Sequence, residues 1–96
     1  MIKVFVGYKV REGVDIQPIL SAFQSHKSQY QGFIGAEILK SVNNGSKIIE
    51  ISTWNEDGAW IDWDKSTEKQ DLLGQIKELL VDQPMVSTYK IVPVSK

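Results

Sequence analysis

Residues 2–10 alternate between apolar and polar side chains, and the apolar ones are mostly β-branched, a pattern typical of a β-strand. One face of this strand carries Ile2, Val4, Val6, Tyr8 and Val10. The apolar spacing then changes to a helical one at Ile16, Ile19, Leu20, Phe23 and Tyr30. This spacing predicts an amphipathic helix over residues 16–29, with Asp15 as its N-cap and Pro18 in its first turn.

Two further strands are predicted on either side of an Asn-Gly turn. Residues 33–42 and 46–54 both have strand-like composition and alternation. Between them, Asn44 and Gly45 form a strong short hairpin signal. The two strands are therefore expected to pair in antiparallel fashion.

The tryptophans gather where the third strand ends. All three of them fall within thirteen residues, at Trp54, Trp60 and Trp63. Asn55 can cap a short helix over residues 56–65 that carries two of these rings. A strand that leads into an aromatic helix in this way predicts a pocket near the tryptophans.

The remaining chain predicts one more helix and one more strand. Ser66 or Thr67 can cap the helix, and Pro84 ends it. Its apolar stripe comprises Leu72, Leu73, Ile76, Leu79 and Leu80. The last strand is predicted over residues 86–94, where Pro93 suggests an edge or a strand end.

The predicted order of elements is β-α-β-β-α-β, with the short tryptophan helix after the third strand. This is the order of the ferredoxin-like α+β fold, in which a four-stranded antiparallel sheet carries its helices on one face. The chain of 96 residues has no linkers, repeats or low-complexity segments, so we expect a single domain over residues 1–96.

Strand parity also predicts a half-apolar second face of the sheet, away from the helices. Its apolar members would be Phe5, Phe33, Leu39, Ile48, Trp54, Val92 and Val94. Its polar members would be Lys3, Lys9, Glu37, Glu50, Ser52 and Lys90. An exposed apolar area of this kind usually marks an interface, so we expect a homodimer in which two sheets pack face to face. The alternative is a solvated face with scattered apolar residues.

Composition excludes several classes of protein. The 12 acidic and 11 basic residues are interleaved, and no basic stripe is present to bind nucleic acid. The absence of cysteine excludes disulfides, thiolate catalysis and thiolate metal sites. With a single histidine, we also expect no dedicated transition-metal site. No stretch has the apolar length of a membrane span and the start lacks a signal-peptide pattern, so we expect a cytoplasmic protein without membrane partners.

Three motifs carry a resemblance to a known family. They are Gly-Phe-Ile-Gly-Ala-Glu-Ile (residues 32–38), Ile-Ser-Thr-Trp-Asn-Glu-Asp-Gly-Ala-Trp (residues 51–60) and Trp-Asp-Lys-Ser (residues 63–66). In sequence and in spacing the chain resembles the antibiotic biosynthesis monooxygenase (ABM) domain family over about residues 2–94. The resemblance implies a dimeric α+β barrel with a pocket between helices and sheet in each subunit. It also implies a range of activities, because some members oxidise phenols, anthrones or quinols with oxygen and without metal or flavin, and one branch degrades haem.

The chain departs from that haem-degrading branch. The branch requires an asparagine on the first strand, a tryptophan in the short helix and a histidine about ten residues later. Trp63 matches the tryptophan, whereas Val6 and Leu73 occupy the other two positions, and leucine cannot ligate iron. We therefore expect neither haem degradation by that mechanism nor any bound cofactor. Gln31 replaces a proline that is frequent in the family, a change that the following Gly32 tolerates.

The aromatic residues are the candidates for ligand contact. Trp60 and Trp63 are three residues apart and share one helix face. They either pack in the core or form a wall that stacks on a flat substrate, and the two roles are compatible. Phe23, Val6 and Leu73 are expected to complete the pocket.

Tyr8 and His26 are the candidates for proton chemistry. Tyr8 lies on the helix-facing side of the first strand, where its phenol could orient a phenolic substrate or assist proton removal. His26 is the only histidine and lies at the boundary of the apolar stripe of its helix. It is either a solvated side chain or a base or hydrogen-bond donor at the pocket rim.

Two functions follow from these residues. The first is a small cofactor-independent monooxygenase that oxidises an electron-rich aromatic compound of the phenol, anthrone or quinol type. In that enzyme Trp60 and Trp63 stack, Tyr8 orients the substrate and His26 serves as a base. The second is a non-catalytic dimer of the same fold that binds a small aromatic ligand. A titratable group facing the pocket favours the enzyme, and a wholly apolar lining favours the binding protein.

Overall fold

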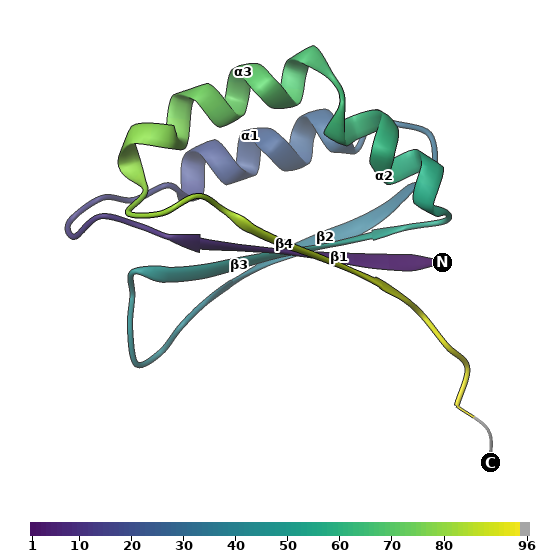
Figure 1. The fold of residues 1–96 in the computed structure, drawn as a ribbon, viewed down its shortest axis with the longest axis horizontal. Helices are drawn as coiled ribbons and strands as arrows, with labels where there is room; N and C mark the ends of the chain where they lie inside the picture. The colour runs from purple at the N-terminus through teal and green to yellow at the C-terminus, as the bar shows by residue number, and fades with distance from the viewer. Residues whose placement is uncertain (95–96) are drawn as a thin grey trace.

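The computed structural model describes residues 1–94. Its strands are β1 (Ile2–Lys9), β2 (Phe33–Lys40), β3 (Lys47–Trp54) and β4 (Met85–Lys90). Its helices are α1 (Gln17–Lys27), α2 (Asp57–Asp64) and α3 (Thr67–Ile76), and a 3₁₀ turn at Lys77–Leu79 continues α3. The strands form one antiparallel sheet in the order β2-β3-β1-β4, with the helices on one face (Figure 1). The predicted ferredoxin-like α+β fold is confirmed.

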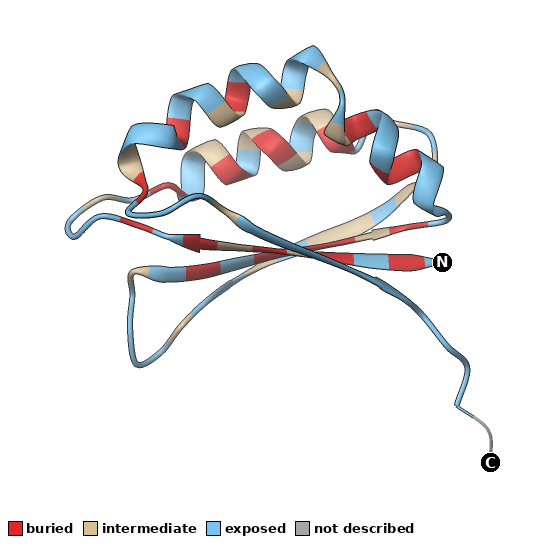
Figure 2. Cartoon of the chain, in the orientation of Figure 1, coloured by how far each residue is buried: buried red, intermediate tan, exposed pale blue. Residues whose placement is uncertain are grey.

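The core lies between the sheet and the helices (Figure 2). Every second residue of β1 is buried, because only one face of the strand meets the helices. On α1 the buried positions are Leu20, Phe23 and Lys27, which follow one another at a spacing of three and four residues. The other helices complete the core with Ala59, Trp60, Trp63, Leu72 and Ile76.

The prediction for the two faces of β3 is wrong. The residues expected on the outer face are buried instead, namely Ile48, Glu50, Ser52 and Trp54. The register explains this, because Glu50 lies opposite the buried Val6 of β1, and directly opposite residues of antiparallel strands share a face. Phe33 is also on the helix side, where its ring meets that of Trp54 edge-on at 5.2 Å. Alternation alone does not fix the phase of β3, since Ile49 and Ile51 make its other face equally apolar.

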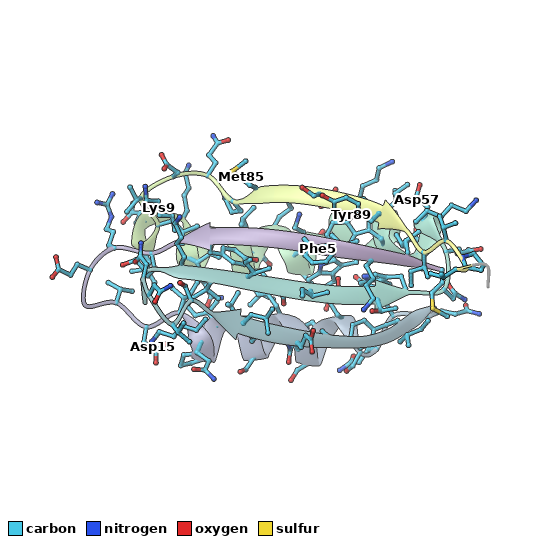
Figure 3. The ribbon with its side chains drawn as sticks, turned by 90° about the horizontal axis from the view of Figure 1, so that it is seen from below. Phe5, Lys9, Asp15, Asp57, Met85 and Tyr89 are labelled. Atoms are coloured by element: carbon cyan, nitrogen blue, oxygen red, sulfur yellow. The ribbon has the colours of Figure 1, made fainter. Side chains whose placement is uncertain are left out.

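The outer face of the sheet is nevertheless half-apolar. Figure 3 views this face, on which the rings of Phe5 and Tyr89 meet edge to face with centroids 5.4 Å apart. The register places further apolar residues beside them, namely Leu39, Ile49, Ile51 and Met85. Lys3, Glu37 and Thr53 interrupt the apolar area. The expected half-apolar face is thus present, although its members on β3 and β4 differ from those predicted. On β4, Lys90 lies opposite the buried Ile2 and so belongs to the helix side, not to the outer face.

Some element ends differ from the prediction. Asn55 does not cap α2, whose N-cap is Glu56 without a side-chain hydrogen bond. Ser66 does cap α3, because its hydroxyl accepts a hydrogen bond from the Lys69 amide at 3.1 Å. β4 ends at Lys90, four residues before the predicted end of the strand.

Asn55 instead joins the start of β2 to the tryptophan helix. The backbone N–H of Asn55 donates a hydrogen bond to the Gly32 carbonyl at 2.8 Å. Gly32 has a φ of 93°, and a Cβ at this position would lie 2.5 Å from Asn55 Oδ1 and 2.6 Å from Ala59 Cβ. Only glycine fits this close approach, which sets where α2 begins relative to the sheet.

Two kinds of feature are absent from residues 1–94. None of their helices combines the length and the apolar composition needed to cross a membrane. The same residues contain no cluster of three or more His, Asp or Glu side chains arranged to hold a metal ion.

Candidate functional site

A cavity of about 650 Å³ lies between the helices and the sheet. Strands β1, β3 and β4 contribute to its lining, together with all three helices and the segment that leads from α3 to β4. Six residues selected from the sequence line it, namely Val6, Tyr8, Phe23, Trp60, Trp63 and Leu73. The fold therefore brings together side chains from β1, α1, α2 and α3 around one space.

His26 lies apart from these residues. Its Nδ1 is 2.8 Å from Glu68 Oε2 in an exposed pair that links α1 to α3. The Tyr30 hydroxyl approaches the other Glu68 oxygen at 3.5 Å. The imidazole is thus engaged on the surface and is not among the side chains that line the cavity.

Helix α2 supplies the aromatic wall of the cavity. Trp63 is 1% exposed, and its ring meets the rings of Phe23 and Tyr30 edge-on at 6.4 and 5.4 Å. Trp60 lies one helical turn earlier, where its ring meets that of the fully buried Trp54 at 6.0 Å. Trp54 does not line the cavity. The two wall tryptophans are therefore held in place by other aromatic rings packed on them.

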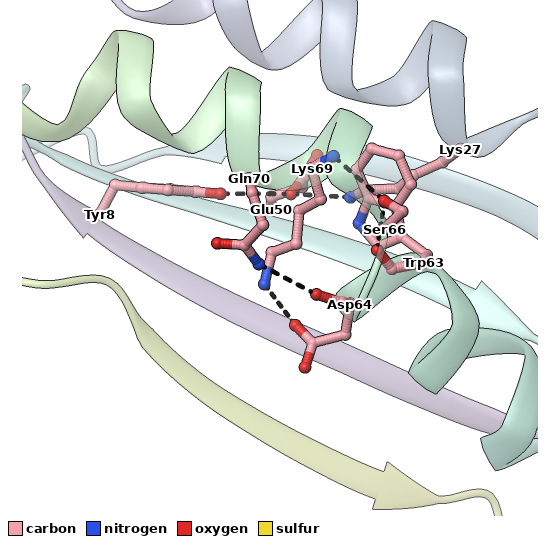
Figure 4. A network of polar contacts seen from close by, with 8 residues as sticks. All are labelled: Tyr8, Lys27, Glu50, Trp63, Asp64, Ser66, Lys69 and Gln70. Atoms are coloured by element: carbon pink, nitrogen blue, oxygen red, sulfur yellow. Dashed lines mark hydrogen bonds and ion pairs between the residues drawn. The ribbon is translucent and has the colours of Figure 1, made fainter.

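Three polar side chains meet in the cavity lining (Figure 4). Lys27 Nζ, from the last turn of α1, donates to Glu50 Oε1 of β3 at 2.9 Å. The Tyr8 hydroxyl of β1 donates to the same oxygen at 3.5 Å. Lys27 Nζ also lies 5.8 Å from the centroid of the Trp63 ring. Lys27, Glu50 and Tyr8 form a polar cluster, and Lys27 brings this cluster into contact with the aromatic wall.

One oxygen atom of this polar cluster accepts no hydrogen bond from the described residues. Both hydrogen bonds to Glu50 reach Oε1, whereas Oε2 is buried and accepts none. Buried carboxylate oxygens normally accept hydrogen bonds, because leaving one without a donor costs about 1–3 kcal/mol or more. Glu50 lines the cavity together with Lys27 and Tyr8, so this unpaired acceptor belongs to a residue of the cavity lining.

Burial shifts the pKa of two side chains of the polar cluster, Tyr8 and Lys27. Desolvation, reinforced by the charge of Glu50, raises the pKa of Tyr8 far above its usual value. Burial lowers the pKa of Lys27, and the carboxylate of Glu50 opposes this lowering. Tyr8 is therefore a hydrogen-bond donor that stays protonated, and the charge of Lys27 depends on Glu50.

A second group of polar side chains lies at the joint between α2 and α3 (Figure 4). Lys69 forms an ion pair with Asp64, and its Nζ lies 5.6 Å from the centroid of the Trp60 ring. Gln70 Nε2 donates to the Asp64 carbonyl at 3.3 Å. Both Lys69 and Gln70 line the cavity, so this joint places a cation and an amide beside the aromatic wall.

Sequence reasoning missed Lys27 and Glu50. The sequence carries a signal for Lys27, because it follows Leu20 and Phe23 at helical spacing and so occupies a position of the apolar stripe. A charged residue at such a position requires a buried partner. The signal for Glu50 is weaker, since it appears only once the register between β1 and β3 is known.

Comparison with known proteins gives a consistent result for the fold. No family model and no curated protein matches the chain. Among solved structures, an antibiotic biosynthesis monooxygenase superposes with a TM-score of 0.85 at 14% identity, over 97% of this chain and 100% of the other. SnoaB, a cofactor-independent oxygenase from Streptomyces nogalater, superposes with a TM-score of 0.86 at 9% identity, over 97% and 94%. A conserved protein from Methanosarcina mazei Go1 gives a TM-score of 0.83 at 13% identity, over 93% and 90%.

At these identities the likeness establishes a shared fold over nearly the whole chain. The resemblance to the ABM domain that the sequence motifs predicted is therefore confirmed at the level of the fold. The activity has to be argued from the cavity itself, because one fold hosts many functions.

Proposed function

We propose that this chain is a cofactor-independent oxygenase that oxidises a small electron-rich aromatic compound with molecular oxygen. The observation that carries the proposal is that an aromatic wall and a buried cluster of ionisable side chains line the same cavity. Trp60 and Trp63 form the wall, and the polar cluster consists of Lys27, Glu50 and Tyr8. A titratable group that faces the cavity is the feature expected of an enzyme rather than of a simple binding protein. The fold shared with SnoaB, a cofactor-independent oxygenase, supports the same conclusion.

The cavity suits a flat aromatic substrate. Its volume of about 650 Å³ falls in the range typical of sites for small molecules. Trp60 and Trp63 stack on the substrate, and Phe23, Val6 and Leu73 close the apolar part of the site. Such a lining also keeps water away from a reactive anion.

The proposed reaction needs no external reductant. A base removes a proton from the substrate, and the resulting anion reacts with molecular oxygen. For a methylene group between two aromatic rings, one oxygen atom becomes a carbonyl oxygen of the product. The other leaves as water with the two hydrogens of the methylene. The protein contributes mainly positioning and desolvation.

Proton transfer falls to groups inside the cavity. His26, the base expected from the sequence, is engaged with Glu68 at the surface. Tyr8 stays protonated and donates to Glu50, so we assign it an orienting role that acts through this carboxylate.

Oxygen uptake by a cavity-filling variant tests the proposal. We expect protein-dependent uptake with a panel of anthrones and dihydroxynaphthalenes. Leu73→Trp places a larger side chain in the cavity and should abolish the uptake. Leu79→Trp is the matched control, because Leu79 is also partly buried but does not line the cavity. Uptake that is absent from the wild type, or equal in the two variants, would refute the proposal.

The second candidate is a non-catalytic protein that binds the same kind of ligand. It is favoured by the absence of an evident free base among the residues predicted from the sequence, since His26 is outside the cavity and Tyr8 stays protonated. Saturable quenching of tryptophan fluorescence without oxygen uptake would support it. The quenching reports on the cavity because Trp60 and Trp63 line it.

A homodimer formed through the outer face of the sheet is part of the proposal. Leu39, Ile49, Met85 and Tyr89 are exposed on that face, and together they make an apolar area of the kind that marks an interface. A cytoplasmic location, and the lack of nucleic-acid and membrane partners, remain predictions from the sequence.

A further inference from the structure

We propose that Glu50 selects the ligand, because its Oε2 accepts a hydrogen bond from a hydroxyl group on a neutral aromatic compound. This inference deepens the proposed function and rests on it for the reaction that follows binding. It assigns the ligand a chemical requirement, a hydroxyl donor, and assigns Glu50 the role of the residue that meets it.

The requirement arises from how the two oxygens of Glu50 are used. Lys27 Nζ and the Tyr8 hydroxyl both donate to Oε1, at 2.9 and 3.5 Å. Glu50 is 1% exposed and lines the cavity, and its Oε2 has no partner among the described residues. The two donors hold the carboxylate by Oε1, so Oε2 is the acceptor left for a hydroxyl group of the ligand.

The charges next to Oε2 favour a neutral donor over an anion at this position. An ionised carboxylate only accepts hydrogen bonds, so a ketone or an ether offers Oε2 nothing. The charge of Lys27 is already matched by Glu50, and a second carboxylate beside Oε2 would face repulsion in a buried site. A hydroxyl group supplies the donor without adding charge.

The neighbouring ring defines the rest of the ligand. Lys27 connects the carboxylate to the aromatic wall, because its Nζ contacts Glu50 and lies over the Trp63 ring. The position for the hydroxyl and the position for a stacked ring are therefore adjacent. A compound with its hydroxyl directly on an aromatic ring can occupy both positions at once.

The same contact provides a proton-transfer step. The O–H bond of the ligand breaks, its proton binds Glu50 Oε2, and the electron pair stays on the ligand oxygen as an aryloxide. The ammonium of Lys27 remains close and compensates the new negative charge. Glu50 is thus the catalytic residue of this step, whereas Lys27 and Tyr8 are positioning residues.

Calorimetric binding of three matched naphthalenes to the wild-type protein tests the selection. We expect 1-naphthol to bind about tenfold more tightly than 1-methoxynaphthalene, because only the former donates to a charged acceptor. We expect 1-naphthoate, which is anionic, to bind more weakly than either. Equal affinities for the first two compounds, or no binding of 1-naphthol, would overturn the inference.

Glu50→Gln provides the matching variant. With Oε1 still accepting from Lys27 and Tyr8, the amide nitrogen of the new side chain faces the cavity as a donor. The variant should lose the preference for 1-naphthol and gain affinity for 1,4-naphthoquinone, which only accepts. Glu68→Gln, the same change on the surface of α3, should keep the wild-type preference. Thermal unfolding checks that both variants are folded, and a folded Glu50→Gln protein that retains the preference also overturns the inference.

Two further results separate the possible failures. Tyr8→Phe should reduce the preference for 1-naphthol but leave the affinity for 1-methoxynaphthalene unchanged, a split that a purely structural role would not produce. Selective binding without oxygen uptake would leave the inference standing and refute the proposed oxygenase. Oxygen uptake without selective binding would do the reverse.

Discussion

Lys27 Nζ lies 2.9 Å from Glu50 Oε1 and joins the last turn of α1 to the middle of β3 inside the protein. The two side chains are only 2% and 1% exposed. A pair so far from water stabilises the fold little, because the loss of hydration offsets the attraction between the charges. Its presence in the cavity lining is better explained by the chemistry of the cavity than by stability.

Removing one member of this pair should cost far more than removing both. Lys27→Met leaves the Glu50 carboxylate buried and uncompensated, and we expect a loss of about 3–5 kcal/mol in the free energy of unfolding. The double variant Lys27→Met/Glu50→Leu removes both charges and should recover most of that loss. Urea denaturation of the two variants measures the coupling. Losses that simply add would contradict the account of the pair.

The alkaline stability of the protein should depend on Tyr8. Burial and the charge of Glu50 raise the pKa of Tyr8 above its usual value of about 10. Above about pH 10 the phenol ionises in the unfolded chain but stays protonated in the folded state. The folded state then binds more protons, so stability falls as the pH rises.

Tyr8→Phe removes this contribution, and its urea midpoint should therefore decline less steeply than that of the wild type between about pH 10 and 11. Lys27 acts with the opposite sign, because its lowered pKa lets the unfolded chain bind more protons below about pH 10.4. The contribution of Lys27 to the free energy of unfolding therefore increases as the pH rises from its folded-state pKa to about pH 10.4. Identical alkaline slopes for the wild type and Tyr8→Phe would show that Tyr8 is not buried as described.

Two glycines should respond in opposite ways to replacement by alanine. Gly74 lies within α3, and a Cβ there would meet nothing within 4 Å. Gly74→Ala should raise the free energy of unfolding by about 1 kcal/mol through helix propensity. Gly32 has a φ of 93° and almost no space beside Asn55, so Gly32→Ala should lower it by about 1–3 kcal/mol. Urea denaturation of both variants checks the contrast, and equal effects would contradict it.

The outer face of the sheet should hold two chains together. Light scattering of the wild type should give a molar mass twice the 10.9 kDa of one chain. Ile49→Glu places a charge on the outer face and should give a monomer. Ile61→Glu changes the same kind of residue, similarly exposed, on helix α2 and should remain a dimer. A wild type that scatters as one chain at micromolar concentration would exclude the dimer.

The sequence predicted the fold better than the site. Alternation in β1 and the helical spacing of Leu20 and Phe23 follow from which side of each element is buried, so both could be recognised without a structure. The wall residues Trp60 and Trp63 were recognised for the same reason, since they share a helix face.

Glu50 could not be recognised in that way. Its strand has apolar residues on both faces, and only pairing with β1 shows which face meets the helices. With the wrong phase for β3, Glu50 is placed on the outer face of the sheet. Lys27 is then left without the buried carboxylate that it pairs with in the structure. Information of this kind depends on contacts between residues far apart in the sequence.

The most direct test of the central claim is the fate of isotopically labelled oxygen. The purified protein is incubated under ¹⁸O₂ with the substrate that gives the highest uptake, and the product is analysed by mass spectrometry. An oxygenase at this cavity predicts one ¹⁸O atom in each product molecule, and none above the uncatalysed background in the Leu73→Trp protein. A product that forms without ¹⁸O, or that is labelled equally by the Leu73→Trp protein, would contradict the claim.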